Sequence, residues 1–491
     1  MLLILIVTLI LLFLIHEFYW KRRNLPPGPI PLPFLGNLLS LKSPRPGYQA
    51  FSDWKKEFGP VFTFWMGSRP FVMICSYEKL KETFVKDGET YTDKPLNQIQ
   101  GKLRGGAYGV LDTNGEVWRD QRRFALTELR NLGLGKDLMQ EKILLEIDEL
   151  QKELDKTCGS TINLPKLIDR SVGNVINLTL FGYRFAEDRA AEFHELKNLI
   201  DSQRSLFSQF KFFLQLQLPA LEKIMPGPNL SEILVQKRLE MDKFYKKQIE
   251  AHKKVINYDE EESSDFVEAY LKEQRKREES GDVESFCNKQ LVAICFDLWL
   301  AGLVTTTITL TWGISYYLHD PEVQRKIQEE LDRVIGSDKT VTMADRPQLT
   351  YLSAFLNETQ RCVNLLPTNL PHETTRDTVI DGFPIPQGTG VIAQISTVML
   401  DETVFPSPLS FNPDRFIKEG KLQKIDELLP FSIGKRQCLG EGMARMELFL
   451  FFGNLFNRYR LKAGKGGLPD IDKSKHSLVL PREFDVVLER K

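Results

Sequence analysis

The chain begins with an almost uninterrupted apolar run. Met1 to Ile15 contains no charged residue, and three aromatic residues at positions 18–20 extend the run. A helix that spans a bilayer needs about 20 predominantly apolar residues, so this pattern predicts a membrane anchor over residues 1–20. A cleaved signal peptide is the alternative, but no basic residue precedes the apolar core and no small-residue cleavage site follows it.

A basic and proline-rich stretch over residues 21–36 follows the anchor. Its three basic residues, 21–23, flank the span, and such residues tend to stay on the cytoplasmic side. Its prolines exclude a helix and predict a stiff, extended hinge that orients the body relative to the anchor. With the body in the cytosol, we expect the three N-x-S/T sequons to stay unglycosylated: Asn177, Asn229 and Asn357.

Residues 37–491 show the patterns of a mainly α fold with small β-sheets. Apolar positions recur with a helical period from Glu116 to Ile335, and a last strong helix is predicted near Glu441 to Asn457. Val61 to Trp65 and Phe71 to Cys75 have the composition of short strands. Because no Ser/Gly-rich or proline-rich linker divides the region, we predict one large catalytic domain.

Two segments interrupt the helical region. Asp259 to Ser264 is acidic and polar, which predicts a solvated loop. Phe212 to Met225 is unusually apolar for a connector. Contact with the membrane and burial in an ordinary helix both explain this composition.

Charge and cysteine content narrow the class of protein. The 65 Lys and Arg residues nearly balance the 66 Asp and Glu residues, so the overall charge indicates neither a nucleic-acid partner nor an acidic substrate. The six cysteines lack the regular spacing of a disulfide framework. This usage indicates a reducing compartment, in which thiols stay free for chemistry.

One cysteine stands in a distinctive frame. Phe431, Gly434, Arg436, Cys438 and Gly440 lie directly before the predicted last helix. Unpaired N–H groups and the positive end of a helix dipole favour a thiolate at such a place, which would make the cysteine a competent iron ligand. The other five cysteines are expected to be small buried apolar residues.

This frame matches F-x-x-G-x-R-x-C-x-G, the haem-binding loop of the cytochrome P450 family, at every fixed position; about 10⁻⁴ such matches are expected by chance. The chain resembles this family over nearly its whole length, and most closely its microsomal, drug- and lipid-oxidising animal branch, which is family 2-like. The resemblance implies a cytochrome P450 fold and haem b with Cys438 as axial ligand. It further implies that Arg436 reaches a haem propionate, Phe431 shields the sulfur, Gly434 permits a tight turn and Gly440 lies against the macrocycle.

A second match is a charged cluster that lies behind the haem in the family. Glu358 and Arg361 stand three residues apart on one predicted helix face, and Arg415 follows in an F-N-P-D-R-F segment. A Glu-x-x-Arg pair alone is common, so the match to the family depends on the order of all three residues along the chain. Removal of one member would leave a buried charge uncompensated at a cost of about 3 to 5 kcal/mol, which implies a structural role.

A third match concerns the haem propionates. Trp118 and Arg122 lie one turn apart in a W-R-x-x-R-R helix, and the resemblance implies that both donate to a propionate. His372 matches another propionate position, and a solvent-facing histidine is the alternative.

Three nearby basic residues are not required by the haem: Arg119, Arg123 and Lys435. They are expected to form a basic docking patch for an acidic electron donor, and an ordinary solvated surface is the alternative.

The oxygen-binding stretch of the family, A-G-x-[D/E]-T-[T/S], corresponds to residues 301–306. Ala301, Gly302 and Thr305 fit, so that small residues leave room for dioxygen and Thr305 steers a proton to it. The usually acidic position is Val304, which puts the proton relay in doubt. Asp297, two helical turns earlier, is one candidate replacement, and an ordered water chain is the other.

The resemblance implies a monooxygenase that inserts one oxygen atom into an apolar small molecule such as a xenobiotic, fatty acid or steroid. Electrons would come from NADPH through a flavoprotein reductase, with a b-type cytochrome as a further partner, at the endoplasmic reticulum membrane. Apart from Asp297, the segments that would line the site indicate no charged pocket: Gly105 to Val110, Phe207 to Leu214, Ala293 to Thr305 and Leu366 to Leu370.

Two other classes stay open at this point. Val304 would suit a haem-thiolate isomerase or dehydratase that rearranges lipid peroxides without a reductase. A non-catalytic haem binder is the other, and an apolar cavity with an oxygen-side threonine argues against it. A comparison of activity with peroxide and activity with NADPH distinguishes the monooxygenase from the isomerase or dehydratase.

Overall fold

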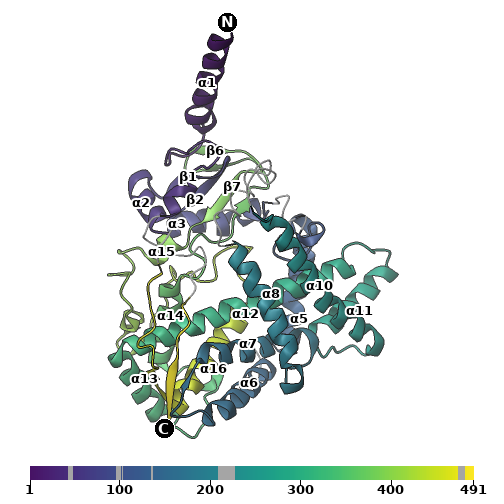
Figure 1. Ribbon diagram of the computed structural model, residues 1–491, viewed down its shortest axis with the longest axis vertical. Helices are drawn as coiled ribbons and strands as arrows, with labels where there is room; N and C mark the ends of the chain where they lie inside the picture. The colour runs from purple at the N-terminus through teal and green to yellow at the C-terminus, as the bar shows by residue number, and fades with distance from the viewer. Residues whose placement is uncertain (43–47, 96–100, 102, 134–136, 208–226, 474–480) are drawn as a thin grey trace.

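A computed structural model describes residues 1–42, 48–95, 101, 103–133, 137–207, 227–473 and 481–491. The protein is mainly helical with small sheets, as predicted (Figure 1). The principal helices are α5 (Gly115–Asn131), α6 (Asp137–Asp155), α7 (Leu164–Phe181), α8 (Ala190–Phe207), α10 (Leu230–Val255), α11 (Phe266–Glu279), α12 (Asn288–His319), α13 (Pro321–Val334), α14 (Thr350–Val363) and α16 (Glu441–Arg458).

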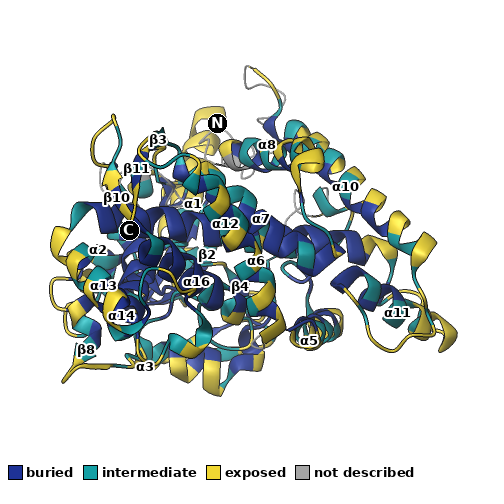
Figure 2. Cartoon of the chain, turned by 90° about the horizontal axis from the view of Figure 1, so that it is seen from below, coloured by how far each residue is buried: buried dark blue, intermediate teal, exposed yellow. Residues whose placement is uncertain are grey.

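Helix α12 is the central element of the domain. It packs against α7, α10, α14 and α16, and its residues are buried on nearly every face, as expected of a core helix. It is apolar and long enough to cross a membrane, but 72% of its apolar stretch is buried inside the protein. Figure 2 shows the buried residues gathered in the middle of the molecule, with exposed residues around its rim.

A four-stranded sheet lies at the end of the molecule from which α1 projects (Figure 1). Its order is β1 (Val61–Met66), β2 (Arg69–Ile74), β7 (Gly390–Ala393) and β4 (His372–Glu373). The two strands predicted from composition pair antiparallel, and β2 pairs parallel with β7. The sheet thereby joins the N-terminal segment to β4, which carries His372.

The remaining strands form smaller sheets. One has the order β10 (Tyr459–Ala463), β11 (Val486–Arg490) and β3 (Thr161–Ile162). The others are two-stranded and pair β5 (Thr378–Ile380) with β6 (Phe383–Ile385), and β8 (Ile417–Lys418) with β9 (Lys421–Leu422).

Helix α1 (Leu2–Phe18) projects from the body with none of its residues buried (Figure 1). The stretch Leu2–Arg22 is long and apolar enough to span a bilayer. Exposure of so many leucines and isoleucines to water is unfavourable, so this helix is consistent with the predicted anchor.

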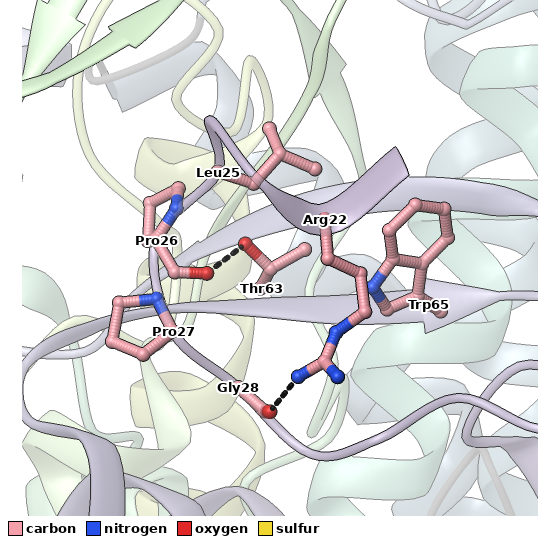
Figure 3. A pocket seen from close by; sticks show the side chains of 7 residues that line it. All are labelled: Arg22, Leu25, Pro26, Pro27, Gly28, Thr63 and Trp65. Atoms are coloured by element: carbon pink, nitrogen blue, oxygen red, sulfur yellow. Dashed lines mark hydrogen bonds between the residues drawn. The ribbon is translucent and has the colours of Figure 1, made fainter. Parts of the chain in front are cut away.

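The proline-rich segment after the anchor is fastened to the body. The backbone N–H of Thr63 donates to Pro27 O at 2.9 Å, and its hydroxyl donates to Pro26 O at 2.8 Å. The Arg22 guanidinium donates to Gly28 O at 3.0 Å (Figure 3). Lys21 Nζ lies 4.6 Å from the centre of the Trp65 ring. The extended stretch therefore runs alongside β1, which limits how freely the anchor can turn.

Asp259 to Ser264 forms an irregular, largely exposed loop, as predicted. Phe212 to Met225, and the 208–214 part of the predicted pocket lining, lie outside the described residues.

Candidate functional site

Cys438 lies in a tight loop just before α16. Its N–H donates to Phe431 O at 3.0 Å, and the N–H of Gln437 donates to Gly434 O at 3.0 Å. Gly434 has φ 89°, and a Cβ there would lie 2.3 Å from Phe84 O. Only glycine fits both the left-handed backbone and this close approach. Gly440 is the N-cap of α16, and a Cβ on it would meet no described atom within 4 Å.

The Cys438 side chain is exposed, but the surrounding protein displaces much of the water around the thiol. This desolvation raises the pKa of Cys438 above the ordinary cysteine value. The N–H of Gly440 and the charge of Arg122 act in the opposite direction without overcoming burial. The N–H at the helix terminus thus favours the thiolate, as predicted, but burial has the larger effect on the pKa of Cys438 in the protein without a bound metal. Coordination to a metal ion deprotonates a thiol outright, so an iron ligand is still compatible with this site.

The oxygen-side stretch lies in the middle of α12. Ala301 is exposed although the helix runs through the core, and the Thr305 hydroxyl donates to Ala301 O at 2.6 Å. Gly302 faces elsewhere, because a Cβ on it would lie 3.1 Å from Ile176 on α7. Its small size is explained by the close packing of α12 against α7.

Several cationic side chains converge between α5 and the Cys438 loop. Arg122 donates to Gln437 O, and the Arg436 guanidinium stacks 3.9 Å from the centre of the Trp118 ring. Burial lowers the pKa of Arg436 to about 9 and that of Lys94 to about 7, with mutual repulsion as a further cause. Such mutually repelling buried cations form a site that fits an anionic group.

Trp118 is a further residue of this site that fits a ligand oxygen. Its side chain is buried, and its indole N–H finds no acceptor among the described residues. A buried unpaired donor is costly, so a ligand oxygen at this place would be stabilising. Together with the cations and an accessible thiol, this residue set fits a planar iron macrocycle that carries carboxylates.

Arg436 departs in part from the role implied by the family frame. Its Nε donates to Thr92 O at 2.7 Å, and further donors reach Val110 O, Thr113 O and Asn114 Oδ1. The guanidinium therefore ties three segments of the chain together as well as contributing positive charge.

Lys94 is a member of the cluster that sequence analysis missed. It is 8% exposed, and its Nζ lies 3.0 Å from Pro371 O and 3.2 Å from His372 Nε2. A lysine in a polar T-D-K-P stretch is expected at the surface, and the neighbouring residues in the sequence do not indicate that it is buried.

His372 is buried, so the solvent-facing alternative is wrong. Its Nδ1 lies 2.8 Å from Tyr91 O, and Phe84 packs edge-on at 5.0 Å between ring centres. Burial, with the charge of Lys94 as a further cause, holds the pKa of His372 well below its ordinary value. The ring is therefore neutral, donates to Tyr91 O and accepts from Lys94.

The Asp297 carboxylate is occupied by partners other than the oxygen-binding stretch. Its carboxylate forms an ion pair with Arg104 at 2.7 Å and accepts from the N–H groups of Val110 and Leu111 at 2.8 and 3.1 Å. Gly109 is required beside it, since a Cβ there would lie 2.3 Å from Asp297 Oδ2. Asp297 thus fastens the 104–111 segment to α12, and the hypothesis that it relays protons is not supported.

The predicted charged cluster lies within the core. Arg361 donates to both Glu358 oxygens at 2.7 Å, and Arg415 Nε donates to Glu358 Oε1 at 3.0 Å. Glu358 and Arg361 are 0% exposed. Arg361 also donates to Met399 O and Pro408 O, so the cluster links α14 to the irregular segment before Cys438.

The three basic residues predicted to form a docking patch share an acidic neighbour. Arg119 and Lys435 lie 3.0 and 3.2 Å from opposite oxygens of Glu89, and Arg123 is exposed. The positive charge of this surface is therefore smaller than the sequence suggests.

Comparison with known proteins places this arrangement among relatives. The cytochrome P450 family model matches residues 26–488. Cytochrome P450 2H1 of Gallus gallus is 34% identical over 471 residues, covering 95% of this chain and 94% of the relative. Cytochrome P450 2J2 of Homo sapiens is 34% identical, covering 92% and 89%. Probable cytochrome P450 CYP36A1 of Caenorhabditis elegans is 35% identical, covering 100% and 99%. The similarity extends over every residue of the site, from Lys94 to Cys438.

Proposed function

Because the chain belongs to the cytochrome P450 family of haem-thiolate monooxygenases, we propose that it inserts one atom of dioxygen into an apolar xenobiotic, fatty acid or steroid-like molecule. The observation that carries the proposal is the accessible Cys438 thiol beside a buried, mutually repelling set of cations and the unpaired indole of Trp118. Electrons come from NADPH through a flavoprotein reductase, and a b-type cytochrome is a further donor.

The residues that would hold the haem can be assigned individually. Cys438 would supply the thiolate ligand, whereas Lys94, Arg122, Arg436 and the indole of Trp118 would hold the propionates. When bound, the haem supplies oxygen activation at an iron whose thiolate ligand favours O–O cleavage.

Thr305 is the residue proposed to position a proton for the chemistry. The Thr305 hydroxyl is held by Ala301 O at 2.6 Å, on the accessible side of α12. From there it can turn to hold a proton for the reacting oxygen. Two helical turns earlier, Asp297 fastens the 104–111 segment to α12.

The protein is proposed to reside in the endoplasmic reticulum membrane, with its catalytic domain on the cytosolic side. The apolar α1 and the basic residues that follow it support this orientation. The basic surface of Arg119, Arg123 and Lys435 is the proposed docking site for the reductase.

The test compares NADPH consumption, hydrogen peroxide release and product formation in the same samples. We expect Thr305→Ala to raise peroxide release and to reduce the share of NADPH that appears in product. Val304→Glu should raise that share or leave it unchanged. Reductase-independent rearrangement of organic hydroperoxides, unaffected by Thr305→Ala, would instead establish the isomerase.

A further inference from the structure

The helix that carries Trp118 and Arg122 begins at an asparagine whose side chain does not cap it. Asn114 is the N-cap residue of α5, where asparagine is favoured because its side-chain oxygen accepts from N–H groups of the first turn. No such hydrogen bond forms among the residues that the structure describes. The N-cap residues Asn163 of α7 and Asn229 of α10 do accept from these N–H groups. Capping therefore does not explain the asparagine at position 114.

The partners of the Asn114 amide come from two distant segments of the chain. Its Oδ1 accepts from the N–H of Lys94 at 2.8 Å, and its Nδ2 donates to Lys94 O at 3.0 Å. One amide thus pairs with both backbone groups of the lysine. Arg436 Nη2 lies 3.3 Å from the same Oδ1 and also donates to Thr113 O. Asn114 therefore links Lys94 and Arg436 at the start of α5.

The amide makes these contacts without a charge of its own. Aspartate has nearly the same shape, is an equally good N-cap residue and suits the positive end of the helix dipole. A carboxylate, however, has no N–H to donate to Lys94 O, and it would pair with the guanidinium of Arg436. The amide, unlike a carboxylate, holds both residues and leaves their positive charge uncancelled.

This positive charge is unfavourable in the haem-free protein. Burial, together with the charges of Arg436 and Arg122, lowers the pKa of Lys94 to about 7, and Asp112 acts in the opposite direction. His372 adds no charge, because burial keeps it neutral. A new negative charge beside these cations would stabilise them in the haem-free protein. The same charge would repel the propionates of the haem.

We propose that Asn114 is a positioning residue for the haem propionates. Its amide holds the main chain of Lys94 and the guanidinium of Arg436 in place, and its neutrality leaves their charge for the propionates. The residue acts through these two cations and is not itself a propionate ligand. This inference rests on the proposed function, because it requires haem bound beside Cys438.

Asn114→Ala tests the positioning in the haem-loaded protein. It removes three hydrogen bonds of the amide and adds no charge. Because Lys94 and Arg436 lose their shared partner, we expect haem to leave this variant at least about tenfold faster. The rate is followed spectroscopically as the haem transfers to an excess of haem-free myoglobin.

Asn163→Ala is the matched control. Asn163 is also an N-cap asparagine, and its Oδ1 accepts from the N–H of Lys166 at 3.2 Å. Loss of this cap should lower the thermal midpoint and leave the haem dissociation rate unchanged. If Asn163→Ala and Asn114→Ala accelerate haem loss equally, the effect is a general loss of stability and the proposal is overturned.

Asn114→Asp tests the neutrality of the amide. The substitution keeps the shape of the side chain and adds one negative charge, so haem should again dissociate at least about tenfold faster. Asn163→Asp adds the same charge at the start of α7 and should leave the rate unchanged.

The pH dependence of haem retention distinguishes an effect of charge from an effect of packing. Above about pH 7 Lys94 loses its proton in the haem-free wild-type protein, and haem binding must restore it, so retention falls as the pH rises. The aspartate of Asn114→Asp should raise the pKa of Lys94 in the haem-free variant, so its retention should change less above pH 7. Asn114→Ala adds no charge and should keep the wild-type pH dependence. The measurement is the Soret absorbance retained after dialysis at each pH.

The outcomes separate this inference from the proposed function. A wild-type protein that binds no haem overturns the proposed function, and the role of Asn114 with it. A wild-type protein that binds haem, with unchanged haem dissociation in both Asn114→Ala and Asn114→Asp, overturns the role of Asn114 alone. The full wild-type pH dependence in Asn114→Asp also overturns it, since the amide would then act by packing only.

Discussion

His372 Nε2 lies 3.2 Å from Lys94 Nζ, and both side chains are buried. The histidine is neutral, because its Nδ1 donates to Tyr91 O and burial opposes a second proton. It therefore orients the lysine without adding charge. A buried lysine held by neutral acceptors is favourable only where an anion arrives to balance it.

This relationship predicts a pH-dependent retention of haem. The pKa of Lys94 falls from 10.5 in the unfolded chain to about 7 in the haem-free protein. Between these values the unfolded chain binds more protons, so the stability of the haem-free protein should rise with pH across that window. Anion binding raises the lysine pKa again, so haem retention should weaken as the pH rises above about 7.

The measurement is the Soret absorbance retained after dialysis at increasing pH, together with proton uptake on haem binding. In Lys94→Met the haem-free protein should be more stable, and its haem retention should be lower and less dependent on pH. Retention that rises with pH in the wild-type protein would contradict this account.

Replacement of Cys438 should abolish thiolate ligation. The reduced, carbon-monoxide-bound wild-type protein is expected to show the long-wavelength Soret band that thiolate ligation produces. Cys438→Ser and Cys438→His should both lose it, because neither side chain supplies a sulfur ligand. Persistence of the band in Cys438→Ser would place the ligand elsewhere in the chain.

Asp297→Ala should loosen the 104–111 segment. The substitution leaves Arg104 without one of its two acidic partners and orphans the N–H groups of Val110 and Leu111. Breaking a buried pair costs about 3 to 5 kcal/mol, measurable as a lower thermal midpoint. Hydrogen exchange should increase in the same segment, whereas the double variant Arg104→Met/Asp297→Leu should regain part of the stability.

Glu89→Gln should strengthen binding of the acidic reductase. Glu89 neutralises part of the charge on Arg119 and Lys435, so its removal leaves a more positive surface. Charges at the rim act mainly on the association rate, and the gain should shrink as salt is added. Surface plasmon resonance with the reductase at two salt concentrations would measure it, and unchanged association would argue against this docking face.

Deletion of residues 1–20 should give a protein that still binds haem and is more easily extracted from membranes. The anchor contributes no buried residue to the domain, so its loss leaves the core intact. Orientation is checked by glycan analysis at Asn357, which lies half-buried on α14. A glycan there would contradict the cytosolic placement of the domain.

The sequence by itself determined the features that depend on local pattern. An apolar run long enough for a bilayer, helical periodicity and a five-position frame around Cys438 are properties of neighbouring residues. They therefore predicted α1, the helical class, the pair β1 and β2, and the start of α16 close to where the structure has them.

The tertiary structure decided the electrostatic partners, because these come from distant parts of the chain. Lys94 meets His372 across 278 residues, Asp297 meets Val110 across 187, and Thr306 meets Glu447 across 141. The same holds for Gly302, whose missing side chain would point at Ile176, and for Cys438, whose pKa follows burial more than the helix terminus. Whether a charge is buried, and what compensates it, is set by which elements pack together, and no local pattern records that.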